Sequence, residues 1–178
     1  MKRLTIAAMV VATAVGAARC GGDSDNPTGP SNSGPIVFTA QLSAANEVPP
    51  ITNAESGGRG SATVTMNVPR DSSGVPTGAG TTNWSIQLTS LPPGTAIILG
   101  HIHTGAAGVN GGVLVNTGLS PAAPALAADG TVNLTFTNID VTATNALNIY
   151  NNPAGFYVNF HTPLNPGGVV RGQLTRTQ

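Results

Sequence analysis

Three histidines are the residues of this sequence best suited to hold a metal ion. His101 and His103 lie two positions apart, and His161 follows much later in the chain. Side chains two residues apart on a β-strand project from the same face, so one strand can present both imidazoles to one ion. Imidazole nitrogen is a good ligand for zinc and copper. The pattern predicts a copper or zinc site formed by His101, His103 and His161.

The same histidines have a structural alternative. The segments HTGAAGVNGGVLV, from His103, and HTPLNPGGVVRG, from His161, resemble each other. Each has His-Thr, a short loop with an asparagine (Asn110 or Asn165), paired glycines and a second expected strand. In this alternative the Thr and Asn side chains bond loop backbone groups, and the histidines bridge the loops. No Asp, Glu or Cys lies close in sequence to complete a metal site, so both interpretations stay open here.

Glu47 and Arg171 are two further candidates, in a chain with only 8% charged residues. Glu47 follows the first expected strand, in the segment NEVPP, and Arg171 lies in the last one. We expect a structural ion pair between them. A buried carboxyl beside an arginine can also act as a catalytic acid. However, the sequence has no recognisable second carboxylate, nucleophile–base pair or Gly-x-Ser-x-Gly motif beside it, so we expect no catalytic residues and no enzyme activity.

The charge balance argues against nucleic-acid binding. An average soluble domain is about 25% charged, whereas Thr, Asn, Gly and Pro are abundant here and lysine occurs only at Lys2. From Cys20 onward four arginines face seven acids, a formal charge of 4 − 7 = −3. Nucleic-acid binding depends on clustered lysine and arginine that neutralise phosphates. We therefore expect no nucleic-acid partner.

The amino-terminal residues have the pattern of an export signal. Two basic residues precede the uncharged, mostly apolar run 4–18, which predicts a secretory signal peptide over 1–19. Cys20, the only cysteine, begins a Gly/Ser/Asn/Pro-rich tether over 20–34 and resembles the lipidated cysteine of bacterial lipoproteins. Arg19 departs from the small residue usual before that cysteine, so cleavage after Ala18 is the alternative. Both alternatives predict an extracytoplasmic protein of the cell envelope, lipid-anchored, periplasmic or secreted.

Hydrophobic alternation predicts an all-β domain over 35–178. Period-two patterns, bounded by turn residues, indicate about eight strands; they cover 36–43, 62–68, 84–89, 96–103, 112–116, 131–136, 155–161 and 169–175. One short helix is expected from Thr142 to Ile149, and the segment 120–128 is expected to be a surface loop. The fold class predicted from this spacing is an antiparallel β-sandwich, Ig-like or Greek-key.

Three stretches, in order, resemble the CHRD (chordin) domain. They are FTAQL with NEVPP, over 38–50; HIHTG with GVNGGV, over 101–113; and NP, YVNFHT, NPGG and RGQL, over 152–174. The chain differs from the family pattern at Val169, where an acidic residue is common, and at Gly112, where proline is common. Chordin is an extracellular antagonist that binds growth factors, and the bacterial members are mostly exported proteins of unknown activity. The resemblance therefore carries no catalytic residues over to this chain.

Two functions follow as hypotheses. The first is a non-catalytic binding or structural module of the cell envelope, attached to the membrane through a lipid on Cys20 and contacting an envelope protein or polymer. The second is a small extracytoplasmic metal-binding or redox protein that uses the three histidines.

Overall fold

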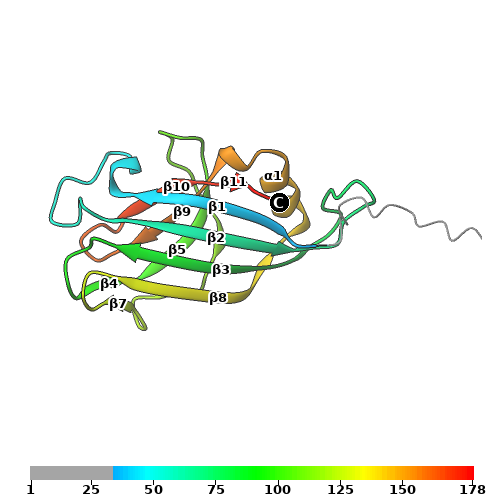
Figure 1. Ribbon diagram of the computed structural model, residues 1–178. Helices are drawn as coiled ribbons and strands as arrows, with labels where there is room; N and C mark the ends of the chain where they lie inside the picture. The colour runs from blue at the N-terminus through cyan, green and yellow to red at the C-terminus, as the bar shows by residue number, and fades with distance from the viewer. Residues whose placement is uncertain (1–33) are drawn as a thin grey trace, which may run out of the picture. The chain divides into compact units, whose positions relative to one another are not determined.

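The computed structural model describes residues 34–178 (Figure 1). The predicted signal peptide, the lipidation at Cys20 and nearly all of the tether lie outside the described residues. The described elements are, in order, β1 (Ile36–Ser43), η1 (Ala44–Asn46), β2 (Arg59–Asn67), β3 (Gly80–Thr89), β4 (Thr95–Ile97), β5 (Leu99–Thr104), β6 (Val113–Asn116), β7 (Ala125–Ala127), β8 (Val132–Val141), α1 (Ala143–Asn151), η2 (Pro153–Gly155), β9 (Phe156–His161), β10 (Val170–Gln173) and β11 (Thr175–Arg176).

The long strands form where the sequence alternates. In β1 every second residue is buried, beginning with Ile36 and Phe38, while the residues between them are partly or fully exposed. Strands β2 and β3 continue the pattern in register: Val64 lies opposite Phe38 on one side and Trp84 on the other. One face of these strands therefore builds the core and the other faces solvent. The strand predictions from period-two spacing are confirmed for this part of the chain.

The sheet closes almost completely into a barrel, and the prediction of a sandwich is wrong. Eight strands pair antiparallel in the order β6-β5-β9-β10-β1-β2-β3-β8, with β11 added beside β1. The edge strands β6 and β8 contact each other without forming a ladder. Strand twist accumulates across a continuous sheet and brings its edges together. Because hydrogen bonds connect all these strands, no second large sheet packs face to face against the first in residues 34–178.

Two segments differ from their predicted structure. The strand expected over 96–103 divides near Ile98 into β4 and β5, and β4 leaves the main sheet to pair with β7. Strand β7 lies in the segment 120–128, which was expected to be a surface loop. Alanine-rich alternation is too weak a signal to predict a strand, whereas pairing with β4 supplies the missing hydrogen bonds.

The single predicted helix is confirmed and is slightly longer than expected. Thr142 caps the amino-terminal end of α1, because its hydroxyl accepts a hydrogen bond from the backbone N–H of Asn145 at 3.2 Å. The helix buries Ala146 and Ile149 against the core and ends at Asn151. Among residues 34–178 no helix has both the length and the apolar character needed to cross a bilayer.

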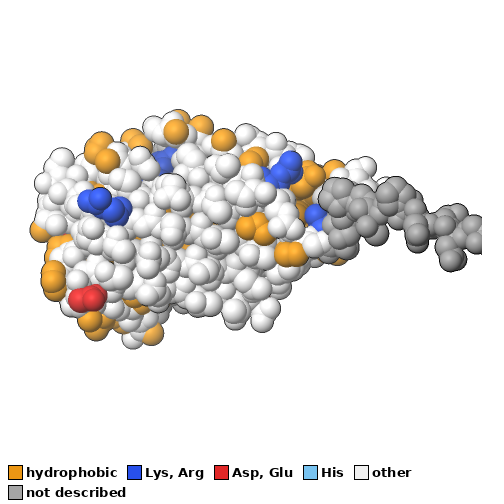
Figure 2. Space-filling view, viewed as in Figure 1, with side chains coloured by type: hydrophobic (Ala, Val, Ile, Leu, Met, Phe, Trp, Pro, Cys, Tyr) orange, Lys and Arg blue, Asp and Glu red, His pale blue; other side chains and the backbone are white. Residues whose placement is uncertain are grey.

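The core and the surface reflect the unusual composition. Trp84, Phe38 and Phe160 are among the largest fully buried side chains. The Trp84 indole N–H donates to the Thr82 hydroxyl at 2.7 Å, so its polar atom is satisfied inside the core. On the face drawn in Figure 2 the surface is mostly uncharged, with isolated basic and acidic side chains. Burial of apolar groups, rather than surface ion pairs, holds this domain together.

A glycine in β2 provides a test of the close strand packing. A Cβ at Gly60 would overlap the backbone carbonyl oxygen of Gln87, whereas one at Gly112 would meet open space. We expect Gly60→Ala to lower the free energy of unfolding by about 1–3 kcal/mol, as overpacking does. Gly112→Ala should change it by less than about 0.5 kcal/mol. Urea titration of both variants checks this, and equal effects would contradict the described register.

Candidate metal centre

The three histidines lie together on the outer face of the barrel, beneath loops. In β5 the Ile102 side chain enters the core, so His101 and His103 project from the opposite face. In the neighbouring strand β9, Phe160 is in the core and His161 projects outward. All three histidines are nevertheless buried, with only 5–8% of each residue exposed, because the loops that follow β5 and β9 cover them. The antiparallel pairing of β5 with β9 therefore brings them together.

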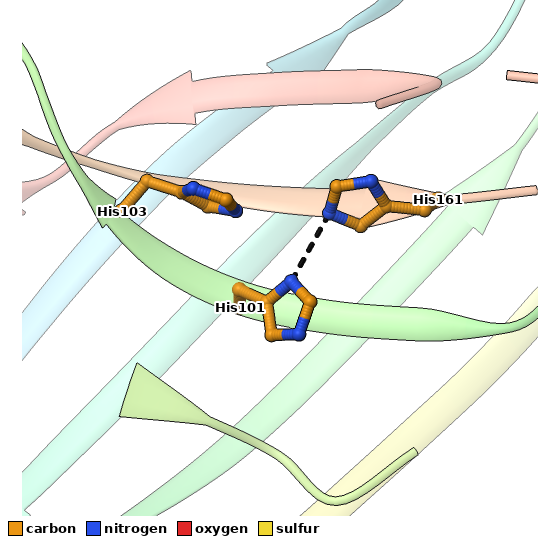
Figure 3. Close-up of side chains that lie close together, drawn as sticks. All are labelled: His101, His103 and His161. Carbon is orange, nitrogen blue, oxygen red and sulfur yellow. Dashed lines mark hydrogen bonds between the residues drawn. The ribbon is translucent and has the colours of Figure 1, made fainter. Parts of the chain in front are cut away.

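The imidazole rings converge on one point (Figure 3). One nitrogen from each ring lies within 4.8 Å of the other two. The closest pair is His101 Nδ1 and His161 Nε2, 3.1 Å apart. Two nitrogens bound to tetrahedral zinc at about 2.0–2.1 Å lie roughly 3.3–3.4 Å from each other. That pair thus has nearly the spacing of a metal site, and the third nitrogen lies within 4.8 Å of both.

Backbone carbonyls fix two of the three tautomers. His103 Nδ1 lies 3.0 Å from the Gly111 carbonyl oxygen, and His161 Nδ1 lies 3.0 Å from that of Pro166. A carbonyl only accepts, so both Nδ1 atoms carry the proton and both Nε2 atoms keep a lone pair. His103 Nε2 is buried without any hydrogen-bond partner. Metal-binding histidines commonly have this arrangement, in which the distal N–H donates to a carbonyl.

The structural alternative for the histidines is also partly correct. The two carbonyl bonds tie His103 and His161 to the loops that follow their strands, as that alternative expected. These bonds use only the Nδ1 atoms. The Nε2 atoms remain turned toward the cluster, so bridging a loop and offering a ligand atom are compatible roles.

Burial keeps the three imidazoles neutral at neutral pH. Desolvation lowers the pKa of His101 to about 4, and the neighbouring His161 and His103 lower it further. Desolvation also lowers the pKa of His103 and of His161, although their carbonyl partners act in the opposite direction. A metal ion binds only the neutral ring. The three rings are therefore neutral at pH 7, with the lone pairs of His103 and His161 on Nε2, while the His101 Nδ1–H donates to His161 Nε2.

Tyr157 and Arg171 form a stack beside His103. The Tyr157 ring lies parallel to the His103 ring, with an interplanar angle of 7° and centroids 5.0 Å apart. The Arg171 guanidinium carbon lies 3.5 Å from the Tyr157 centroid. Tyr157 was missed in the sequence, although its position on the same face as His161, four residues earlier on the strand, is a signal that could have identified it.

Arg171 holds the loop over residues 105–112. Its Nη2 donates to the carbonyls of Ala106 and Val109, each at 2.8 Å, and its Nη1 donates to Asn110 Oδ1 at 3.1 Å. The side chain is 1% exposed, so these oxygens replace water as its partners. Arg171 therefore fastens the 105–112 loop to the barrel.

Glu47 is a buried carboxyl next to this network. Burial raises its pKa to about 7, while the Arg171 charge and a hydrogen bond from Asn159 oppose the rise. Its Oε1 has no hydrogen-bond partner. The structure thus places Glu47 within electrostatic reach of Arg171, whose guanidinium hydrogen bonds go to the 105–112 loop and to Gln173. The ion pair between the two remains a prediction.

A second buried carboxylate, Glu55, was not found from the sequence. It accepts a hydrogen bond from the Thr162 hydroxyl at 2.6 Å and another from the Asn165 amide. These bonds fix the loop over residues 162–169, which presents the Pro166 carbonyl to His161. Glu55 lies in a Gly/Ser-rich stretch more than 100 positions from its partners, and no local pattern points to it.

The segment between β1 and β2 borders two cavities. One, of about 330 Å³, lies between this segment and the 162–169 loop, and its lining includes Glu47 and Pro166. The other, of about 610 Å³, lies toward the 105–112 loop, and its lining includes Glu47 and Arg171. The loops that cover the histidines are thus bordered by open space, but none of the three histidines lines either of these cavities.

Comparison with known proteins identifies the family. The CHRD domain model matches residues 38–174, which is most of the chain, so the chain belongs to the CHRD domain family. No match was found among curated proteins or among solved structures. The resemblance expected from the sequence is confirmed. Residues from all three of its motif stretches meet in the network around Arg171 and the histidines.

Glu47 gives a pH test of this buried network. Its pKa of about 7 in the folded protein exceeds the ordinary value of 4.5, so between these values the folded state holds a proton that the unfolded state has lost. The retained proton stabilises the folded state. Its contribution to the free energy of unfolding is fully present below pH 4.5 and is lost as the pH rises to about 7. The neutral variant Glu47→Gln lacks it.

We therefore expect the stability of Glu47→Gln relative to the natural chain to rise by up to about 1.4 kcal/mol per pH unit in that window. Urea unfolding of both proteins at several pH values measures the difference, from which the histidine contributions cancel. A difference that does not vary with pH would contradict the burial described for Glu47.

Proposed function

We propose that this CHRD-domain protein binds a copper or zinc ion through His101, His103 and His161. The observation that carries the proposal is the convergence of three buried, neutral imidazoles with ligand atoms within 4.8 Å of one another. Two of those atoms are held as acceptors by carbonyl bonds on the far side of their rings. Nitrogen-only ligation by imidazole suits copper and zinc.

The ligand atoms follow from the hydrogen bonds. His103 and His161 would each bind through Nε2, because their Nδ1 atoms carry protons. His101 would bind through Nδ1, the atom that now lies 3.1 Å from His161 Nε2. With the metal bound, the proton of the neutral His101 ring would occupy its Nε2. Three protein ligands leave one position of a tetrahedral ion for a further group.

The remaining expectations belong to the same proposal. The basic residues and apolar run before Cys20 support export, and the Gly/Ser-rich segment after it supports a tether to the envelope. A domain placed there would bind its ion outside the cytoplasm. A non-catalytic role as an envelope module that contacts a protein or polymer is compatible with a bound ion.

Metal content and affinity test the proposal. The purified full chain, stripped with a chelator and reloaded, is expected to bind one equivalent of copper or zinc, measured by mass spectrometry of the metals and by titration calorimetry. Removal of a residue that hydrogen-bonds a metal ligand typically lowers metal affinity by about 10–100-fold. Removal of a ligand itself should therefore lower the affinity by at least about 100-fold. We expect such losses in His101→Ala, His103→Ala and His161→Ala.

A matched control is Val113→Ala, in β6. Val113 lies directly opposite His103 in the β5–β6 pairing and is 53% exposed, so its truncation should leave metal affinity unchanged. Circular dichroism and melting curves establish that each variant is folded. If the natural chain takes up no copper or zinc, or if the three alanine variants bind as tightly as the natural chain, the proposed function is wrong.

A further inference from the structure

One proposed ligand, His103, lies where its strand is paired irregularly on one side. The pairing of β5 with β6 is regular up to Ile102 and shifts register at His103. The carbonyl that orients the His103 ring belongs to Gly111, in the 105–112 loop, which has no regular secondary structure. On its other side β5 pairs regularly with β9 through His103, which fixes the backbone there. The contacts of the side chain then set where the His103 ring points.

The contacts that do so lead to Arg171. Three of its hydrogen bonds go to residues 106–110, immediately before Gly111. They fix the end of the loop that presents the Gly111 carbonyl to His103. Because the guanidinium is planar and rigid, it can bridge these oxygens in one geometry, which a lysine cannot do.

The second route from Arg171 to His103 passes through Tyr157. Strand β9 lies between β5 and β10 in the sheet, so His103 and Arg171 approach Tyr157 from opposite sides. The guanidinium lies over one face of the Tyr157 ring and the imidazole stacks on the other. The Tyr157 hydroxyl also accepts a hydrogen bond from the Gly111 amide at 3.3 Å. The backbone of Gly111 is thus held by two bonds. Its N–H donates to Tyr157, and its carbonyl accepts from His103.

We propose that Arg171 and Tyr157 are positioning residues for the metal site, which together hold the His103 imidazole with Nε2 turned toward the ion. This inference rests on the proposed metal-binding function. Neither residue touches the ion, and each acts through the His103 ring and the Gly111 peptide. It also gives a role to the arginine of the RGQL segment and the tyrosine of the YVNFH segment, which the ligand set alone does not explain.

The test compares metal affinity in conservative variants of the full chain. Arg171→Lys keeps the positive charge but loses the planar guanidinium that bonds several oxygens at once. Tyr157→Leu loses the aromatic ring between His103 and Arg171, and Tyr157→Phe loses only the hydroxyl. We expect the first two to weaken binding by about 10–100-fold and Tyr157→Phe to weaken it less. The absorption spectrum of the Co²⁺-loaded protein should change with them, because the ligand geometry changes.

The chain offers a matched control in a second arginine–tyrosine pair. The Arg176 guanidinium carbon lies 4.2 Å from the Tyr150 ring centroid, and Arg176 Nη1 donates to the Tyr150 carbonyl. The two residues lie on β11 and α1, which carry none of the three histidines. Arg176→Lys and Tyr150→Phe should leave both the affinity and the Co²⁺ spectrum unchanged.

A double-mutant cycle separates positioning from general damage to the fold. If Arg171 acts through His103, then Arg171→Lys should have no further effect on affinity in a His103→Ala background. General damage would lower affinity in both backgrounds, and that result would overturn the inference. Natural affinity and spectrum in Arg171→Lys, Tyr157→Leu and Tyr157→Phe would also overturn it while leaving the proposed function intact. Absence of metal binding by the natural chain would instead refute the proposed function itself.

Discussion

Strand β9 is buried on both of its faces, and this constraint organises the functional side of the molecule. All six of its residues are buried. The face toward the barrel interior is apolar, whereas the face toward the loops carries Tyr157, Asn159 and His161. A buried polar group without a partner costs about 1–3 kcal/mol, so a polar face can be buried only if nearly every atom on it is bonded. The loops that cover β9 must therefore supply hydrogen-bond partners rather than apolar contacts.

The loops meet this requirement mainly through backbone carbonyls. The carbonyls of Gly111 and Pro166 receive the histidine N–H groups, and those of Ala106 and Val109 receive the Arg171 guanidinium. Three buried side-chain atoms in residues 34–178 remain without a partner: Glu47 Oε1, His103 Nε2 and Asn159 Oδ1. His103 Nε2 and Asn159 Oδ1 are acceptors, and Glu47 Oε1 is one when the carboxyl is ionised. A cation would complement unpaired acceptors of this kind, as the proposed metal site requires.

The sequence identified the parts of this arrangement that depend on local spacing. Period-two alternation specifies which residues of β1, β2 and β3 are buried, and the His-x-His spacing specifies that His101 and His103 share a face. Closure of the barrel was not predictable in this way, because alternation assigns faces but does not say where the edges of a sheet go. Glu55 and Tyr157 were missed because their roles come from contacts with residues distant in sequence. The hydrogen bonds from Thr162 and Asn165 to Glu55 impose no recognisable pattern on the residues next to Glu55 in the sequence.

Burial has opposite effects on the two kinds of titratable group in this layer, and the difference favours metal binding. Desolvation disfavours any charged form, so it lowers the pKa of the imidazoles and raises that of Glu47. Near neutral pH the histidines are thus unprotonated, while Glu47 can exchange its proton. A cation would therefore meet three neutral rings and would release no net proton from them, although the His101 proton must move from Nδ1 to Nε2. Burial therefore both leaves acceptors unpaired and keeps the imidazoles neutral, which are two properties that the proposed metal site requires.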